Sequence, residues 1–193
     1  TETTVETNVV SAVSNLLGNT PLEEAMHRNL ERLGPPPFDQ ADKEFARQIQ
    51  ATLTEADIAS TFRRAGMPAN PDMTLCEFVV PLTAKGDAMV GSTDVGDVSW
   101  AVPTVQARVA TCAIGTPGHS WQLTAQGKTP AAHKGMVQAA KLMASTAVDA
   151  ISNPALVTAA KADHQARLGK HPYVCPMPDD VMPPLQPRPI AAE

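Results

Sequence analysis

The chain has 193 residues, of which 43% are hydrophobic and 18% charged, and its formal net charge is −5 at pH 7. This composition predicts a globular domain with a substantial core, and the acidic balance lacks the basic surface that a nucleic-acid partner requires. The sequence shows neither a run of about 18 apolar residues nor a signal-peptide pattern, so we expect no membrane partner and a cytoplasmic location. Three widely spaced cysteines, Cys76, Cys112 and Cys175, predict reduced thiols.

The first half of the chain predicts one strand followed by three helices. Residues 3–17 alternate and are rich in Thr and Val, which indicates a strand and then a loop. Thr20, Pro21 and Glu23 form a helix-start pattern that predicts a helix over 21–33, and Asp39 and Thr54 are N-cap candidates for two more. The periodicity is lost over residues 65–83, where the apolar run at 75–82 fits either a short strand or a lid-like loop.

The second half predicts a buried strand and two further helices. Residues 104–114 are rich in β-branched residues and end at Gly115, and a strand that leads into a functional loop is typical of α/β folds. Thr129 begins a long helix that ends near Ile151, and Asn153 begins another that closes at Gly169. The proline-rich tail at 170–193 is predicted to be extended. One face of the long helix, expected to pack on a sheet, comprises Met136, Ala140, Met143, Ala147 and Ile151.

The residues most suited to chemistry fall between 91 and 136. Asp94 and Asp97 lie three apart in a glycine-containing loop, a spacing that suits metal coordination or the orientation of a histidine, although local turn capping explains it equally well. His119 follows the predicted strand on a loop, where a neutral imidazole is a good ligand for zinc or manganese. His133 falls in the first turn of a helix, whose dipole favours a neutral ring that could bind metal or a substrate, or simply pack.

A family resemblance is carried by four runs: NLLGNTPLEEAMHRNLERLGPPPF, GSTDVGDVSWAVPT, GTPGHSW and AAHKGM. With these, most of the chain resembles the C-terminal part of the aminobenzoyl-glutamate utilisation protein B group, within the aminoacylase and carboxypeptidase family of metal-dependent amidohydrolases. The resemblance implies an α/β fold, namely the second half of a metallopeptidase-like catalytic domain in which helices flank a sheet. Residues 1–17 would be the end of a lid domain with its return strand, and 18–193 the C-terminal part of the catalytic domain.

The same resemblance implies a site with two divalent metals, zinc or manganese, that hydrolyses an amide bond in a small N-acyl amino acid such as aminobenzoyl-glutamate. His119 best matches the family's last metal ligand, and His133 is the competing candidate. Asp94 and Asp97 match the family's acidic loop without its usual Glu-Asp-Phe form, and would orient a ligand or bind substrate. The remaining residues expected beside the substrate are Trp100, Thr116, Gly118 and Trp121.

The family's other metal ligands and its paired glutamates have no counterpart in this chain, and a catalytic zinc normally needs about three protein ligands. We therefore expect no catalytic residue here and no activity without a missing N-terminal half, supplied by the same gene product or by a second chain in a homo- or hetero-oligomer. The alternative is a non-catalytic assembly or binding subunit that completes a partner's fold.

Overall fold

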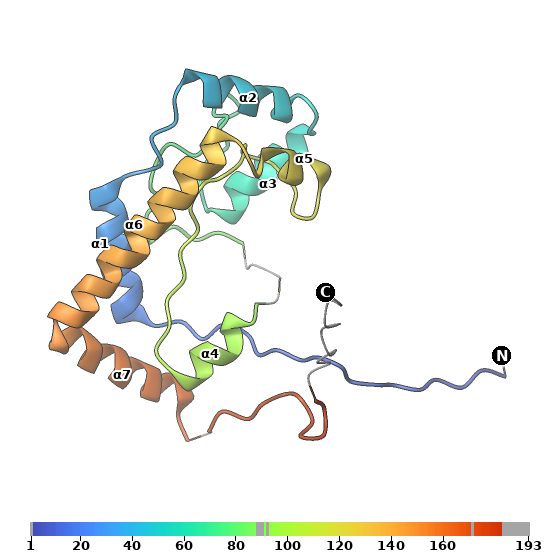
Figure 1. Cartoon of the computed structure of the whole chain (residues 1–193), viewed down its shortest axis with the longest axis vertical. Helices are drawn as coiled ribbons and strands as arrows, with labels where there is room; N and C mark the ends of the chain where they lie inside the picture. The colour runs from blue at the N-terminus through green and yellow to red at the C-terminus, as the bar shows by residue number, and fades with distance from the viewer. Residues whose placement is uncertain (1, 88–90, 92, 171, 183–193) are drawn as a thin grey trace, which may run out of the picture.

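The computed structural model describes residues 2–87, 91, 93–170 and 172–182, and these residues form seven α-helices joined by extended segments (Figure 1). The long α6 crosses the molecule beside α1, and α7 turns back from the end of α6. The helices are α1 (Thr20–Leu33), α2 (Gln40–Gln50), α3 (Glu55–Arg64), α4 (Val95–Ala101), α5 (Trp121–Gln126), α6 (Pro130–Ser152) and α7 (Pro154–Leu168).

Side-chain caps explain where most of the helices begin. Asp39 and Thr54 each accept a hydrogen bond from the backbone three residues on and complete a capping box, as the sequence predicts. Thr129 caps α6 and Asn153 caps α7, each followed by a proline in the first turn. The predicted start of α1 is wrong by one residue, because Asn19 and not Thr20 is the cap.

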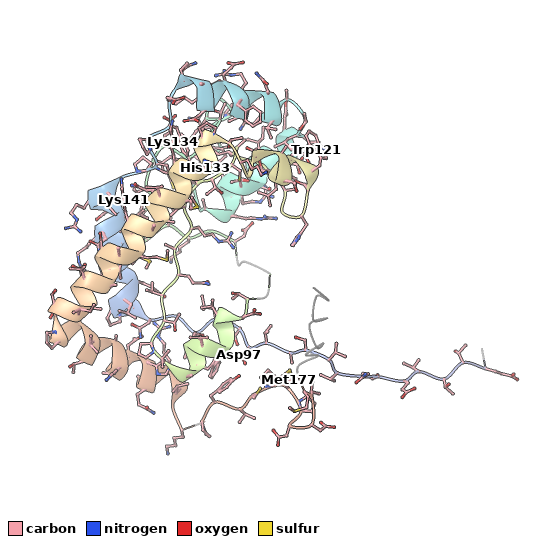
Figure 2. All side chains as sticks on the ribbon, viewed as in Figure 1. Asp97, Trp121, His133, Lys134, Lys141 and Met177 are labelled. Carbon is pink, nitrogen blue, oxygen red and sulfur yellow. The ribbon has the colours of Figure 1, made fainter. Side chains whose placement is uncertain are left out.

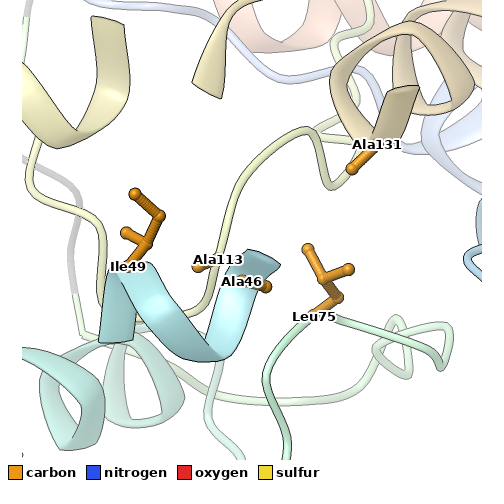
Figure 3. Close-up of a cluster of buried hydrophobic side chains, with 5 residues drawn as sticks. All are labelled: Ala46, Ile49, Leu75, Ala113 and Ala131. Carbon is orange, nitrogen blue, oxygen red and sulfur yellow. The ribbon is translucent and has the colours of Figure 1, made fainter. Parts of the chain in front are cut away.

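The main apolar cluster lies where α2, the start of α6 and two non-helical segments meet (Figure 3). Its members come from widely separated parts of the sequence, and the partly buried Phe38 and Phe45 pack against it. Gln50 of α2 fastens the two non-helical segments together, since its Nε2 donates to the carbonyl oxygens of Met73 and Ile114, each at 3.1 Å. The buried cluster comprises Ala46, Ile49, Leu75, Ala113 and Ala131.

Polar side chains join α1 to α6 and α7. Asn19 Nδ2 donates to the Ala160 carbonyl at 2.8 Å, and Asn29 Nδ2 donates to Asp149 at 2.6 Å. Gln138 Nε2 donates to the carbonyl oxygens at the end of α1, Leu33 at 3.0 Å and Gly34 at 2.6 Å. Because each of these bonds has a fixed geometry, they set the rotation of α6 about its own axis.

The predicted α/β fold is wrong for the described residues, which contain helices and no sheet. Residues 3–17 and 104–114 are extended, as their composition predicts, but a strand also requires a neighbour for its backbone groups. Within the second segment only Ala113 and Ile114 donate backbone N–H bonds, to the Gln126 side chain and to the Thr74 carbonyl. The strands predicted from the composition of these two segments are therefore wrong for the described chain, because pairing depends on partners that sequence patterns do not show.

The predicted packing face of α6 is also reversed. Met136, Met143 and Ile151 are exposed, whereas Gly135 and Leu142 on the opposite side are buried. Gly135 permits close contact with the extended segment 104–114, because a Cβ at this position would lie 2.1 Å from the Ala110 carbonyl oxygen. The helix thus packs through the side that carries Gly135, Gln138 and Leu142, and no sheet covers its exposed apolar side in the described chain.

None of the helices in the described part of the chain is long and apolar enough to cross a membrane. Residues 172–182 of the predicted extended tail contain no helix or strand, and the rest of that tail, 183–193, lies outside the described residues. The division into a lid remnant at 1–17 and a catalytic part at 18–193 stays a prediction, and Thr1 is not among the residues described.

Candidate functional site

The turn that carries His119 begins where the extended segment 104–114 ends against α3. Ile114 N–H donates to the Thr74 carbonyl at 2.9 Å, which fixes the end of the segment. Gly115 follows with φ of 95°, and a Cβ there would lie 2.8 Å from Ile58 Cγ1. Glycine is needed at this position both for its backbone conformation and for the close contact with α3.

Gln126 of α5 holds the turn from the inside. Its Oε1 accepts a hydrogen bond from Ala113 N–H at 2.7 Å, and its Nε2 donates to Thr116 Oγ1 at 3.0 Å and to the Gln122 carbonyl at 3.0 Å. Thr116 Oγ1 in turn donates to the Ala113 carbonyl at 2.7 Å. Both polar atoms of this buried amide are therefore used, and the start of the turn is fixed to a helix that follows it.

Ser120 fastens the other end of the turn. Its Oγ donates to the Pro117 carbonyl at 2.7 Å and accepts a bond from Leu123 N–H at 3.2 Å, so that it closes the turn and caps α5. Gly118 and His119 lie between these fixed points, and both are exposed. His119 therefore lies in a turn, as predicted, but the segment before it is not the predicted strand.

His119 has φ of 57°, and it is the one non-glycine residue with positive φ in the described part of the chain. This left-handed conformation is uncommon outside glycine, and backbone strain of this kind concentrates at binding and catalytic sites. Thr116 and Ser120 are fixed by hydrogen bonds before and after His119. The imidazole itself is exposed and has no hydrogen-bond partner in the described chain, and Trp121, two residues on, is 62% exposed.

Asp94, Asp97 and Trp100 lie on or beside α4, away from the His119 turn. Figure 2 shows Asp97 and Trp121 well apart, in the lower and the upper part of the molecule. Asp94 is exposed and makes no capping bond, although it precedes the first residue of α4. The described chain does not bring either acid to His119, so a role for these residues beside a metal or a substrate stays a prediction.

Asp97 instead connects α4 to the N-terminal segment, through Ser14, and to the C-terminal segment, through Tyr173. Its Oδ1 accepts a hydrogen bond from Tyr173 Oη at 2.6 Å and another from Ser14 N–H at 3.1 Å. These donors lower the pKa of the Asp97 carboxyl, Tyr173 most, and the same bond raises the pKa of the tyrosine. Trp100 Nε1 donates to the Asn15 carbonyl at 2.8 Å, so this indole also holds the N-terminal segment.

Two further residues of α4 complete this attachment. A Cβ at Gly96 would lie 1.9 Å from the Ser14 carbonyl oxygen, so the N-terminal segment crosses the helix in direct contact. Ser99, which is fully buried, accepts a bond from Leu17 N–H at 2.8 Å, and its carbonyl lies 2.9 Å from His164 Nε2. Because a carbonyl only accepts, Nε2 of His164 carries the proton here.

His133 is exposed in the first turn of α6, apart from both other groups. It lines a shallow pocket of about 240 Å³ together with Pro37, Val137 and Lys141. The neighbouring Lys134 lies beside Asp39, at 2.6 Å, and the buried Asp42. His133 thus adjoins a mainly apolar pocket in which Lys134 is already paired with two carboxylates and Lys141 is the one cation with no ion pair within the described chain.

The arrangement of the described His, Cys, Asp and Glu side chains decides whether they could hold a metal ion. No group of three or more His, Cys, Asp or Glu side chains comes together among them. Cys76 and Cys112 have their thiol pKa raised by burial, which disfavours the thiolate that a metal would need. The described residues therefore do not form a complete metal site, and His119 can offer only one ligand.

Sequence reasoning missed Gln126, His164 and Tyr173. His164 lies four residues after the buried Ala160, a helical spacing that indicates an inward position. Tyr173 is the chain's only tyrosine and stands among prolines, which singles it out as an anchor. Nothing in the sequence near Gln126 indicates that its amide would be buried.

A protein of known function shares much of this sequence. The chain is 41% identical to the B subunit of p-aminobenzoyl-glutamate hydrolase from Escherichia coli K12 over 193 aligned residues, which cover 95% of this chain and 40% of the relative. No family model matches the chain, and no solved structure matches it. This similarity confirms the resemblance found in the motifs, and the chain spans well under half of the length of this relative.

Proposed function

We propose that this chain is part of a hydrolase that cleaves an amide bond in an N-acyl amino acid of the aminobenzoyl-glutamate type, and that it contributes His119 as one ligand of a divalent metal. The observation that carries the proposal is the conformation of His119, a strained and exposed histidine on a turn anchored at both ends. The hydrolase class and the substrate type are supported by the name of the E. coli relative.

The proposal includes a second polypeptide region that completes the site. The described chain contains no group of three or more His, Cys, Asp or Glu side chains around His119 or elsewhere, whereas a catalytic zinc normally needs about three protein ligands. The relative has 60% of its length outside the match, which is enough polypeptide to supply the others. In amide hydrolysis a bound zinc or manganese makes water a stronger nucleophile by lowering its pKa.

The role of this chain's own residues is to position the imidazole. Gln126 and Ser120 hold the two ends of the turn, so that His119 does not have to be ordered when a metal binds. The exposed Trp121 offers an apolar surface next to it, suitable for an aromatic acyl group. His133 lies on a different element and is proposed to contact the substrate's carboxylates and not the metal.

The test uses a chimera in which this chain replaces the matched stretch of the E. coli relative. Metal content by elemental analysis and hydrolysis of p-aminobenzoyl-glutamate are measured for the chimera and for His119→Ala and His133→Ala. We expect His119→Ala to lose metal and activity, and His133→Ala to keep its metal. Full metal content in His119→Ala, or hydrolysis by the isolated chain, would contradict the proposal.

A non-catalytic assembly subunit is the second candidate, and the exposed apolar residues of α6 favour it. Such a subunit would need a partner but would not need His119. A chimera that keeps its metal and its activity after His119→Ala would therefore favour this second function.

A further inference from the structure

One side of α6 exposes a continuous apolar surface, which we call the α6 apolar face. Exposure reaches 60% at Met136, 61% at Met143 and 82% at Ile151. The face extends over more than three turns of the helix, and no described element covers it. Its residues are Met136, Val137, Ala140, Met143, Ala147, Val148 and Ile151.

The helix cannot hide this face by rotating. On the inner side of α6, Gln138 Nε2 donates to the two carbonyl oxygens at the end of α1. Thr146 Oγ1 accepts a hydrogen bond from Asn29 Nδ2 at 3.4 Å and donates one to the Leu142 carbonyl at 2.9 Å. Rotation would leave these buried polar groups without partners, which is costly. The apolar side chains on the outer side of α6 therefore stay exposed in the described chain, and a large exposed apolar patch is typical of a surface that contacts other protein.

The size of the face bears on what covers it. A large apolar side chain contributes roughly 60–120 Å² when fully buried, so five that are partly exposed, with the alanines between them, offer about 200–400 Å². A stable interface needs about 800 Å² from each partner. Two copies of this chain that paired only through α6 would fall short of that area. A larger covering polypeptide, which also contacts neighbouring elements, would reach it.

The edge of the face indicates the chemistry of the covering surface. Val137 and Lys141 lie at the edge of the face near the start of α6. Lys141 is exposed, and Figure 2 shows it on the same stretch of α6 as His133 and Lys134. The surface that fits here is apolar at its centre, with an acidic group at the rim beside Lys141.

We propose that the α6 apolar face is an internal contact surface, covered by the polypeptide that corresponds to the part of the E. coli relative outside the match. The 60% of the relative that this chain does not span provides a polypeptide of sufficient size. The inference rests on the proposed function in one respect, namely that this chain works as part of a larger protein.

Methionine oxidation in the chimera tests the covering directly. Met182 is 76% exposed in the C-terminal segment and serves as the reactive control, and Met26, 7% exposed in α1, as the protected one. With dilute hydrogen peroxide and peptide mass spectrometry, we expect Met136 and Met143 to oxidise at least about 10-fold more slowly than Met182, because a covered thioether is inaccessible. Oxidation of both at the rate of Met182 would overturn the proposal.

Two further measurements distinguish the covering polypeptide from a second copy of this chain, and the covering of α6 from the metal-binding role of His119. Protection that disappears on dilution, with a dimer seen by sedimentation, would assign the face to a second copy and overturn the inference. His119→Ala in the chimera should leave the protection unchanged. If His119→Ala loses its metal while Met136 and Met143 stay protected from oxidation, both proposals are supported. If the variant keeps its metal while both methionines stay protected, only the proposed role of His119 is contradicted.

A variant gives an independent check. Met143→Glu places a charge at the centre of the face, and Lys161→Glu places one on the exposed surface of α7. If the face is covered, Met143→Glu lowers the melting temperature of the chimera by several degrees, because the charge is buried without a partner, and Lys161→Glu does not. Equal melting temperatures for the two variants would contradict the covering.

Discussion

The side-chain carbonyl of Gln126 accepts a hydrogen bond from the backbone N–H of Ala113 at 2.7 Å, so the residue that ends α5 fixes the backbone that precedes the His119 turn. Thirteen residues separate the two partners, and the whole turn lies between them. The rigidity of this turn therefore depends on a side chain outside it.

Replacement of Gln126 by leucine is expected to lower the free energy of unfolding by about 1–3 kcal/mol, because Ala113 N–H and Thr116 Oγ1 lose a buried partner. Urea denaturation followed by circular dichroism measures the change. Gln48→Leu on the exposed side of α2 is the control and should change stability by less than about 0.5 kcal/mol. Equal effects of the two substitutions would show that the Gln126 bonds are unimportant.

Two substitutions of His119 that both remove the imidazole should differ in stability. Because φ is 57° at this position, His119→Gly should be more stable than His119→Ala by about 1 kcal/mol. The comparison is made by thermal or urea denaturation of both variants side by side. An alanine variant at least as stable as the glycine variant would mean that the turn does not impose the left-handed conformation.

The pH dependence of stability should include a contribution from Asp97. Its pKa in the folded chain is held below the ordinary value, mainly by the Tyr173 hydroxyl. The carboxylate therefore stabilises the fold above the unfolded pKa of about 3.9, and this contribution is lost as the pH falls through the lower folded pKa.

Urea denaturation between pH 6 and pH 2 would show the Asp97 contribution as a steeper loss of stability in wild type than in Asp97→Asn. Asp39 and Asp57 also have lowered pKa values, so the variant should retain part of the slope. Tyr173→Phe should reduce the slope in the same direction as Asp97→Asn. Identical slopes in all three proteins would show that the bond to Tyr173 does not stabilise the fold.

Ser99→Ala should loosen the N-terminal segment, because Leu17 N–H then has no acceptor. We expect a loss of about 1–2 kcal/mol in the free energy of unfolding and faster amide hydrogen exchange over residues 13–17. Ser145→Ala on α6 is the matched control, since the Ser145 side chain makes no hydrogen bond within the described chain. If exchange over these residues is unchanged, the segment is held by other contacts.

The helices could be predicted from the sequence because their signals are local. Asp39, Thr54, Thr129 and Asn153 begin helices for reasons contained within four residues of chain. The sheet was predicted wrongly because residues 104–114 have the composition of a strand but find no strand partner in the described chain. Pairing is a long-range property, and only the structure could show its absence there.

The candidate site was predictable in part for the same reason. The loop position of His119 follows from the strand-like run before it and the helix after it, both local features. The strained backbone and the role of Gln126 depend on contacts across the turn, which no spacing rule contains. Asp97 had the correct chemical character for an anchoring acid, but its partners, Ser14 and Tyr173, lie 83 and 76 residues away.

Gly96, where the N-terminal segment crosses α4, also has a consequence for how that segment attaches. The contact between Ser14 and Asp97 closes a loop of 83 residues, for which the entropy cost is about 4 kcal/mol before any bond forms. Attachment of the N-terminal segment must offset that cost, and it requires the bare backbone of Gly96, because a side chain as small as alanine there would obstruct the approach of the Ser14 carbonyl.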